Sequence, residues 1–180
     1  GKQRRLLLLR GFLGTAALFC VFEAITTLPL ASATVIQYSY PTFTALAAFY
    51  LLGEGIGSRI WQAVAIGWVG ITMIVHPGWR GDYIVGLPLM GVLVALTGAF
   101  LTAMAYICVR KLSEKEHPLV IVNYFPLISV PICLPFVISF GSFPSIEEWL
   151  WLLGVGLFTQ IGQIWITHGL SLLPAAQASS

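Results

Sequence analysis

Long apolar runs alternate with short polar turns along nearly the whole chain. Six runs meet or approach the roughly 20 residues that a helix needs to cross a bilayer. They are Leu6–Leu28, Ala31–Leu52, Ile60–His76, Gly86–Val109, Leu119–Phe140 and Trp149–Leu172. None of them alternates with a period of two, which argues against strands. The pattern therefore predicts an all-α, polytopic helical membrane protein with six transmembrane helices.

The segments between the runs carry the residues that end membrane helices. They are Leu28-Pro29, the glycine-rich stretch 53–58, Pro77-Gly78, the charged stretch 110–118 and the stretch 141–144. Hydrophobic residues make up 58% of the chain and charged residues only 9%, which leaves too little polar surface for a soluble domain. Cys20, Cys108 and Cys133 stand alone within apolar runs, so we expect neither disulfides nor a metal site.

Eight of the nine lysine and arginine residues fall on one side of the membrane if the chain crosses it at every run. These are Lys2, Arg4, Arg5, Arg10, Arg59, Arg110, Lys111 and Lys115, whereas Arg80, Asp82, Glu147 and Glu148 fall on the other side. Because cytoplasmic loops are enriched in basic residues, we expect the loops of Arg59 and Lys115 in the cytoplasm, within a plasma or bacterial inner membrane. A cleaved signal peptide is disfavoured, since the first run continues to Leu28 without a small-residue cleavage pattern.

A weak internal repeat relates the first and sixth runs. At an offset of 145 residues, the segment 11–32 lies over 156–177, and the match pairs Gly11 with Gly156 and Leu28-Pro29 with Leu173-Pro174. The offset contains five spans, so the first and sixth runs cross in opposite directions, as the inverted repeats of transporters require. On this interpretation the chain is part of a longer protein, with two spans before Gly1 and most of two after Pro174.

The stretch from Leu28 to Pro41, LPLASATVIQYSYP, followed by an apolar helix that closes at Gly53-Glu54, resembles EamA-type proteins of the drug/metabolite transporter superfamily. The resemblance implies a ten-helix fold of two inverted five-helix repeats. Residues 1–76 would then belong to the first repeat, as helices 3–5. Residues 77–180 would belong to the second, as helices 6–8 and the start of helix 9. It also implies transport of small metabolites or drugs, more often export than uptake.

Three ionisable residues are candidates for coupling or gating. Glu23 is a lone acid inside an apolar span, which is costly and marks a cavity, a partner or a proton path. It lies about 9 Å outward from the middle of its span at 1.5 Å per residue, and its repeat equivalent is His168, which we expect a similar distance inward. Both are candidates for proton coupling, with an interior hydrogen-bonded histidine as the alternative for His168. Glu54 matches the Gly-Glu of the family and is expected to act as a loop anchor or gate hinge, its charge compensated by Arg59 or by backbone donors.

Polar side chains recur at helical spacing on two spans and are candidates to bind the solute. They are Thr34, Gln37, Pro41 and Thr44 on the second span, and Gln160, Gln163, Thr167 and Ser171 on the sixth. Such stripes must face other helices or a wet cavity, so interhelical hydrogen bonding is the alternative to binding. We select Gln37, Tyr38, Pro41, Gln160, Gln163 and Thr167 as solute-binding candidates, with Tyr40, Tyr106, Tyr124 and Trp165 as further aromatic walls.

Two further features concern packing. Pro126, Pro131 and Pro135 lie within ten residues of the fifth span, which predicts a bent or interrupted helix. Gly67 and Gly70, with Ala63 one turn earlier, predict a face of the third span that packs closely against another helix.

No motif of a hydrolase, metalloprotease or nucleotide-binding site is present, so the chain is not expected to be an enzyme or to need a cofactor. We therefore expect gradient-driven transport by alternating access, with a non-transporting polytopic scaffold or sensor as the alternative. The expected partners are the lipid bilayer and a small-molecule solute. Protons and a second copy of the chain are further candidates, and no nucleic acid is expected.

Overall fold

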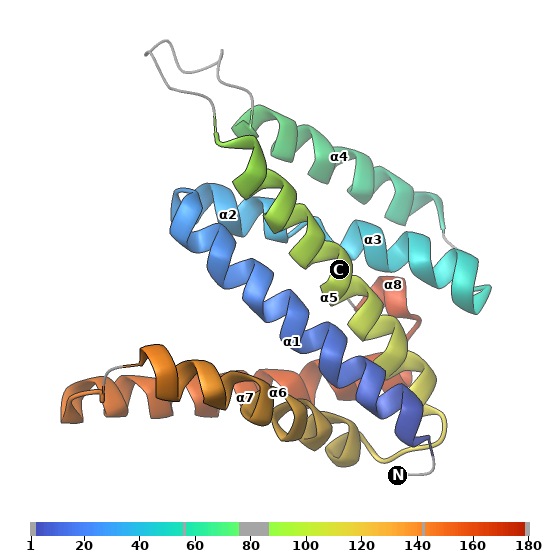
Figure 1. Ribbon diagram of the computed structural model, residues 1–180. Coiled ribbons are helices and arrows are strands. Elements are labelled where there is room, and N and C mark those ends of the chain that lie inside the picture. Colours follow the sequence, from blue (N-terminus) through green and yellow to red (C-terminus); the bar gives the residue numbers. More distant parts are fainter. Residues whose placement is uncertain (1–2, 56, 76–86, 142, 179–180) are drawn as a thin grey trace.

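The computed structural model describes residues 3–55, 57–75, 87–141 and 143–178, and every regular element within these ranges is a helix. In chain order the helices are α1 (Arg4–Thr27), α2 (Leu30–Gln37), α3 (Tyr40–Ala47), the π-helix η1 (Ala48–Leu52), α4 (Ser58–Val75), α5 (Leu89–Ser113), α6 (Pro118–Phe140), α7 (Ile146–Leu172) and α8 (Ala175–Ala178). Figure 1 shows their arrangement. Their composition and length confirm a polytopic helical membrane protein.

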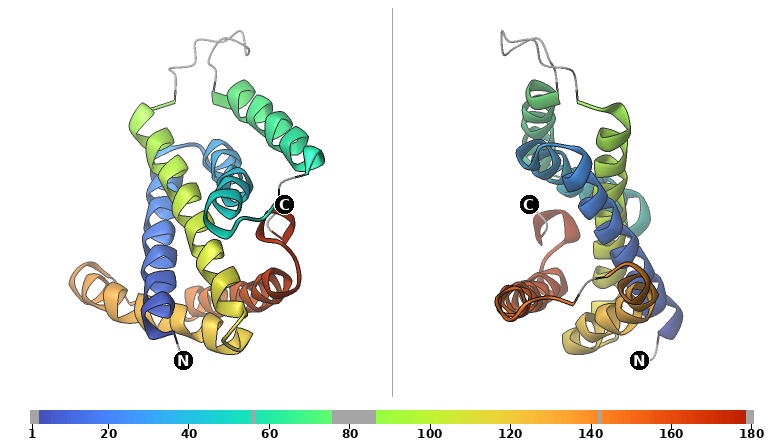
Figure 2. Two further views of the ribbon diagram at one scale, coloured as in Figure 1. Left: turned by 90° about the vertical axis from the view of Figure 1, so that its right-hand side faces the viewer. Right: turned by 60° about the vertical axis from the view of Figure 1, so that its left-hand side comes forward.

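Helices α1 and α5 run side by side in opposite directions and form the centre of the molecule (Figure 2). Small residues on α5 line this contact, and Gly91, Ala95 and Gly98 are all buried. A methyl group added to Gly98 would lie 3.0 Å from the Cβ of Cys20 and 3.6 Å from the backbone oxygen of Ala17. The missing side chains thus let the two backbones approach, as is common between membrane helices.

Four of the six expected spans are helices long and apolar enough to cross a membrane, namely Arg4–Thr27, Leu89–Ser113, Pro118–Ser139 and Ile146–Leu172. The expected second span is instead divided into α2, α3 and η1, and the third contributes the shorter apolar stretch Ile60–Met73 of α4. His76 and Gly86, predicted as span ends, lie outside the described residues. The second run is therefore not one continuous α-helix, and its crossing of the membrane as a sixth span stays a prediction.

Pro41 explains why the second span is divided. Proline has no backbone N–H, and its ring clashes with the carbonyl four residues earlier, which here is that of Gln37. The α-helical pattern accordingly ends at Gln37 and resumes at Tyr40, with Ser39 N–H turning to the oxygen of Ile36 at 3.0 Å. The chain thus places a helix break next to the polar side chain of Gln37.

Two packing predictions have different outcomes. Helix α6 is uninterrupted although Pro126, Pro131 and Pro135 lie inside it, so an interruption was wrong and a bend stays a prediction. Gly67 and Gly70 do not form a close helix contact, because a methyl group added to either glycine would meet nothing within 4 Å among the described residues. The closely packed small-residue surface belongs to α1 and α5 instead.

Several chain segments meet at one end of the molecule, toward the right of Figure 1. The backbone N–H of Gln3 donates to Glu116 at 2.9 Å, which joins the start of α1 to the turn before α6. Glu54, after η1, accepts hydrogen bonds from Arg110 near the end of α5 and from Ala175 at the start of α8. The α1–α2 and α6–α7 connections lie toward the left of Figure 1. The segments predicted to share the cytoplasmic side therefore share one end, and the compartment that this end faces stays a prediction.

The two Leu-Pro turns of the repeat have the same local geometry. Leu28 has φ −117° and ψ 155°, and Leu173 has φ −119° and ψ 155°. Each donates its N–H to the carbonyl four residues earlier, at 2.8 and 2.9 Å. Thr26 and Ser171, also related by the offset of 145, each donate a hydroxyl to the carbonyl three residues earlier. The turns match locally, and the ten-helix inverted repeat as a whole stays a prediction.

Candidate functional site

A cavity of about 360 Å³ lies beside the break between α2 and α3. Its walls come from α1, α2, α3 and α5, together with the turn between α2 and α3. The lining residues are Val21, Ala24, Ile25, Ala33, Thr34, Gln37, Tyr38, Tyr40, Thr102 and Tyr106. We call this space the Gln37 cavity. It brings together two predicted solute-binding residues, Gln37 and Tyr38, with a threonine and two tyrosines on neighbouring elements.

The side-chain amide of Gln37 uses its nitrogen in a hydrogen bond, but its oxygen has no partner among the described residues. Its Nε2 donates to Thr102 Oγ1 at 3.2 Å, and the Thr102 hydroxyl donates to the backbone oxygen of Gly98 at 2.8 Å. The Gln37 Oε1 atom is buried and has no hydrogen-bond partner among the described residues. Tyr40 and Tyr106 stack edge to face beside it, with ring centroids 5.5 Å apart. The side chain thus keeps one buried, unpaired acceptor atom close to Gly98, with the aromatic wall at its side.

A second, smaller cavity of about 120 Å³ adjoins the first and shares Val21, Thr102 and Tyr106 with it. It lies among α1, α5, α6 and α7, and Arg10, Phe125 and Gln163 line it. We call it the Arg10 cavity. Gln163, predicted from the polar stripe of the sixth span, accepts a hydrogen bond from Arg10 Nη2 at 3.1 Å. The two predicted polar stripes therefore reach adjoining cavities.

Arg10 was counted among the basic residues of the cytoplasmic side, but the structure places it inside the protein rather than in a loop, and the side of the membrane stays a prediction. The side chain is only 3% exposed, and its guanidinium carbon lies 4.8 Å from the centre of the Phe125 ring. A signal was present in the sequence, since Arg10 follows four leucines and is therefore inside the first apolar run, unlike Arg4 and Arg5. A charge in that position marks a functional site by default.

The other predicted solute-binding residues lie outside the two cavities. Pro41 lies in the first turn of α3 and causes the break. Thr167 is 1% exposed, and its hydroxyl has no partner among the described residues. Gln160 is half-buried on α7 and lines neither cavity. Their direct roles stay predictions.

The two proton-coupling candidates do not share a site. Glu23 is exposed near the end of α1, and its backbone oxygen accepts the hydroxyls of Thr26 and Thr27. His168 lines a separate open cleft of about 590 Å³ between α7 and the start of α6, together with His117 and Ser113. The two side chains therefore lie in different parts of the structure, and proton coupling stays a prediction.

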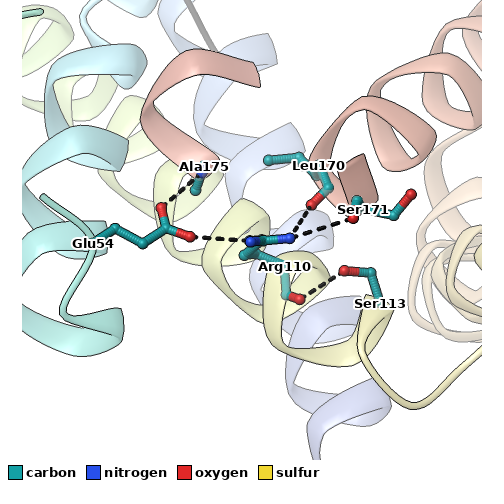
Figure 3. A network of polar contacts seen from close by, with 6 residues as sticks. All are labelled: Glu54, Arg110, Ser113, Leu170, Ser171 and Ala175. Carbon is teal, nitrogen blue, oxygen red and sulfur yellow. Dashed lines mark hydrogen bonds and ion pairs between the residues drawn. The ribbon is translucent and has the colours of Figure 1, made fainter. Parts of the chain in front are cut away.

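Glu54 is the centre of a polar network that joins three parts of the chain (Figure 3). Its Oε1 accepts from Arg110 Nε at 3.0 Å, and its Oε2 accepts from the backbone N–H of Ala175 at 2.8 Å. Arg110 also donates through Nη1 to the carbonyl of Leu170 at 3.2 Å. The charge of Glu54 is thus compensated by Arg110 and by a backbone donor of α8, while the side chain of Arg59 lies outside the described residues.

The chain belongs to the EamA-like transporter family, whose model matches residues 1–76 and 89–180. It is 32% identical over 167 residues to the pseudopaline exporter CntI of Pseudomonas aeruginosa, and this alignment covers 92% of this chain and 57% of that protein. It is 30% identical over 184 residues to solute carrier family 35 member G1 of Mus musculus, and that alignment covers 94% of this chain and 49% of the relative.

A third similar protein is the S-adenosylmethionine uptake transporter of Rickettsia prowazekii, at 26% identity over 140 residues, with 78% of this chain and 46% of that protein covered. The chain spans about half the length of these curated relatives. No solved structure matches it. The resemblance to drug/metabolite transporters is thereby confirmed, and the names of the relatives indicate transport rather than catalysis.

Proposed function

We propose that this protein is a gradient-driven secondary transporter that exports a small polar or amphipathic solute by alternating access. The observation that carries the proposal is the Gln37 cavity beside the helix break at Pro41. Transporters build midplane binding sites from discontinuous helices, because irregular backbone is tolerated in a membrane only where it lines a cavity or is buried in protein. The break and the cavity coincide here.

The polarity of the cavity supports solute binding over interhelical hydrogen bonding alone. Gln37 and Thr102 bond to each other, but Gln37 Oε1 is left without a donor among the described residues. A buried polar atom without a partner costs on the order of 1–3 kcal/mol. A solute or water that donates a hydrogen bond to this oxygen would remove that cost. The adjoining Arg10 cavity gives the site a second polar end.

Alternating access would require the halves of the protein to move against each other around this site. The matching geometry at Leu28 and Leu173 supports two related halves. The Glu54 network lies at the end where α5, α7 and α8 meet, so it is a candidate gate that closes one side. Export is proposed because a relative that is 32% identical to this chain is named an exporter.

Efflux from liposomes tests the proposal even though the solute is unidentified. The natural full-length protein is reconstituted into liposomes loaded with a metabolite extract, a pH gradient is imposed, and the released solutes are identified by mass spectrometry. We expect at least one solute to leave faster than from protein-free liposomes, and the Gln37→Leu variant to lower that flux at least tenfold. Identical release of every solute would favour the non-transporting scaffold or sensor.

A further inference from the structure

Arg10 is a buried cation without a carboxylate partner in the part of the chain that the structure describes. Its polar contacts are the neutral amide of Gln163 and the ring of Phe125. Its Nε atom is buried and has no hydrogen-bond acceptor among the described residues. A buried charge that is not paired costs several kcal/mol. The site is therefore one negative charge short.

The direction of the Arg10 side chain is informative. Long basic side chains near the end of a membrane helix normally reach back to the water interface, and helical side chains lean toward the N-terminus. Arg10 does the opposite, because a methyl group added to Gly14, one turn deeper along α1, would lie 2.7 Å from Arg10 Nη1. The guanidinium thus occupies the space that Gly14 leaves free, and it points away from the cytoplasmic end predicted for α1.

Arg110 provides an internal comparison. It is also drawn into the protein, at 24% side-chain exposure, but there Glu54 supplies the carboxylate at 3.0 Å. Of these two arginines, one is neutralised by the chain itself and the other faces a cavity. The difference indicates that the anion for Arg10 comes from outside the described chain.

We propose that Arg10 binds the carboxylate of the transported solute, so that the solute class is small amphipathic carboxylates. This inference rests on the proposed function. The Arg10 cavity would hold the carboxylate, and the adjoining Gln37 cavity would hold the polar or aromatic remainder, because the two spaces share Thr102 and Tyr106. One guanidinium with one free buried donor suits a monoanionic carboxylate better than a phosphate dianion, which is usually held by several cations or backbone donors.

Matched pairs of acids and amides test the site. The purified full-length protein is melted in detergent at constant ionic strength with benzoate, phenylacetate or N-acetylglycine, and with the primary amide of each. We expect at least one acid to raise the melting temperature while its amide does not. Equal shifts of the melting temperature for every acid and its amide, or no shift at all, would overturn the inference. An acidic residue elsewhere in the full-length protein that already pairs with Arg10 would overturn it too.

Variants at two arginines of the same helix provide the control. Arg10→Gln should weaken binding of the acid about tenfold to a hundredfold, the loss expected for one charge-assisted contact, and Arg10→Lys should retain part of it. Arg5→Gln removes the same charge from the exposed end of α1 and should bind as the unmodified protein does. Equal binding by Arg10→Gln and Arg5→Gln would contradict the proposal. The wild-type preference for acids is measured independently of whether Arg10→Gln folds.

Flux of the same compounds in liposomes separates this inference from the proposed function. If an acid binds through Arg10 but is not moved across the membrane, the anion site stands and the transport proposal fails. If amides are moved and acids are not, transport stands and the carboxylate inference fails.

Discussion

Breaking the Glu54–Arg110 ion pair should destabilise the end of the molecule at which α5, α7 and α8 meet. Glu54 accepts two hydrogen bonds and Arg110 donates to both Glu54 and the carbonyl of Leu170. Charge-assisted hydrogen bonds contribute about 1.5–3 kcal/mol each when buried. These side chains are 17% and 24% exposed, so solvent screens part of that energy.

We therefore expect Glu54→Ala or Arg110→Ala to lower the free energy of unfolding by about 2–3 kcal/mol each. The double variant should lose only about 3–4 kcal/mol, because the ion pair is lost once, which gives a coupling energy of about 1–2 kcal/mol. Glu54→Gln keeps an acceptor for Ala175 and should cost about 1 kcal/mol.

Unfolding of the full-length protein in mixed micelles, titrated with SDS and followed by tryptophan fluorescence, measures these values. Glu114→Ala removes an exposed acid from the same end of the molecule and should change stability by less than about 0.5 kcal/mol. Fully additive effects of Glu54→Ala and Arg110→Ala would disprove the prediction, since they would mean that the two side chains do not interact.

Three further predictions concern packing, binding and coupling. Gly98→Ala should destabilise the protein by about 1–3 kcal/mol in the same unfolding assay, because the added methyl group would press on α1 at 3.0 Å, whereas Gly162→Ala on α7 meets nothing and should be neutral or mildly stabilising. Gln37→Leu should lower solute flux at least tenfold with little change in stability. The control Gln62→Leu, at an exposed position of α4, should leave flux unchanged. Equal flux in both variants would exclude a binding role for Gln37. Glu23→Gln should remove the pH dependence of flux if Glu23 couples transport to protons, and an unchanged pH profile would exclude that role.

The fold class and the position of the helix break follow from sequence patterns alone. In a membrane, the backbone N–H and C=O groups of each long apolar run must form hydrogen bonds within the protein, and a helix does this within one segment. Pro41 fixes the break because its ring acts on a carbonyl at a known distance along the chain. Because Gln37 lies four residues before Pro41, the sequence alone also predicts that the polar stripe meets the break.

Features that depend on which helices become neighbours were predicted less well. The small residues of α5 and those around Gly67 look alike in the sequence, yet only the former face another helix closely among the described residues. Arg10 was not expected inside the protein, because its charge was counted toward the membrane orientation without its surroundings. Its ring and amide partners, Phe125 and Gln163, come from parts of the chain more than a hundred residues away, so no local pattern reveals them.

A wet, polar cavity between α1, α2 and α5 is what the proposed transport requires, and cysteine labelling at Thr102 tests for it most directly. In a background without Cys20, Cys108 and Cys133, Thr102→Cys lies in both cavities, and Phe100→Cys, two residues earlier on α5, replaces a half-exposed side chain outside them. We predict that a membrane-impermeant thiol reagent modifies Thr102→Cys and leaves Phe100→Cys unmodified. Failure of the reagent to reach Thr102→Cys from either side of the membrane would contradict the solute pathway proposed here.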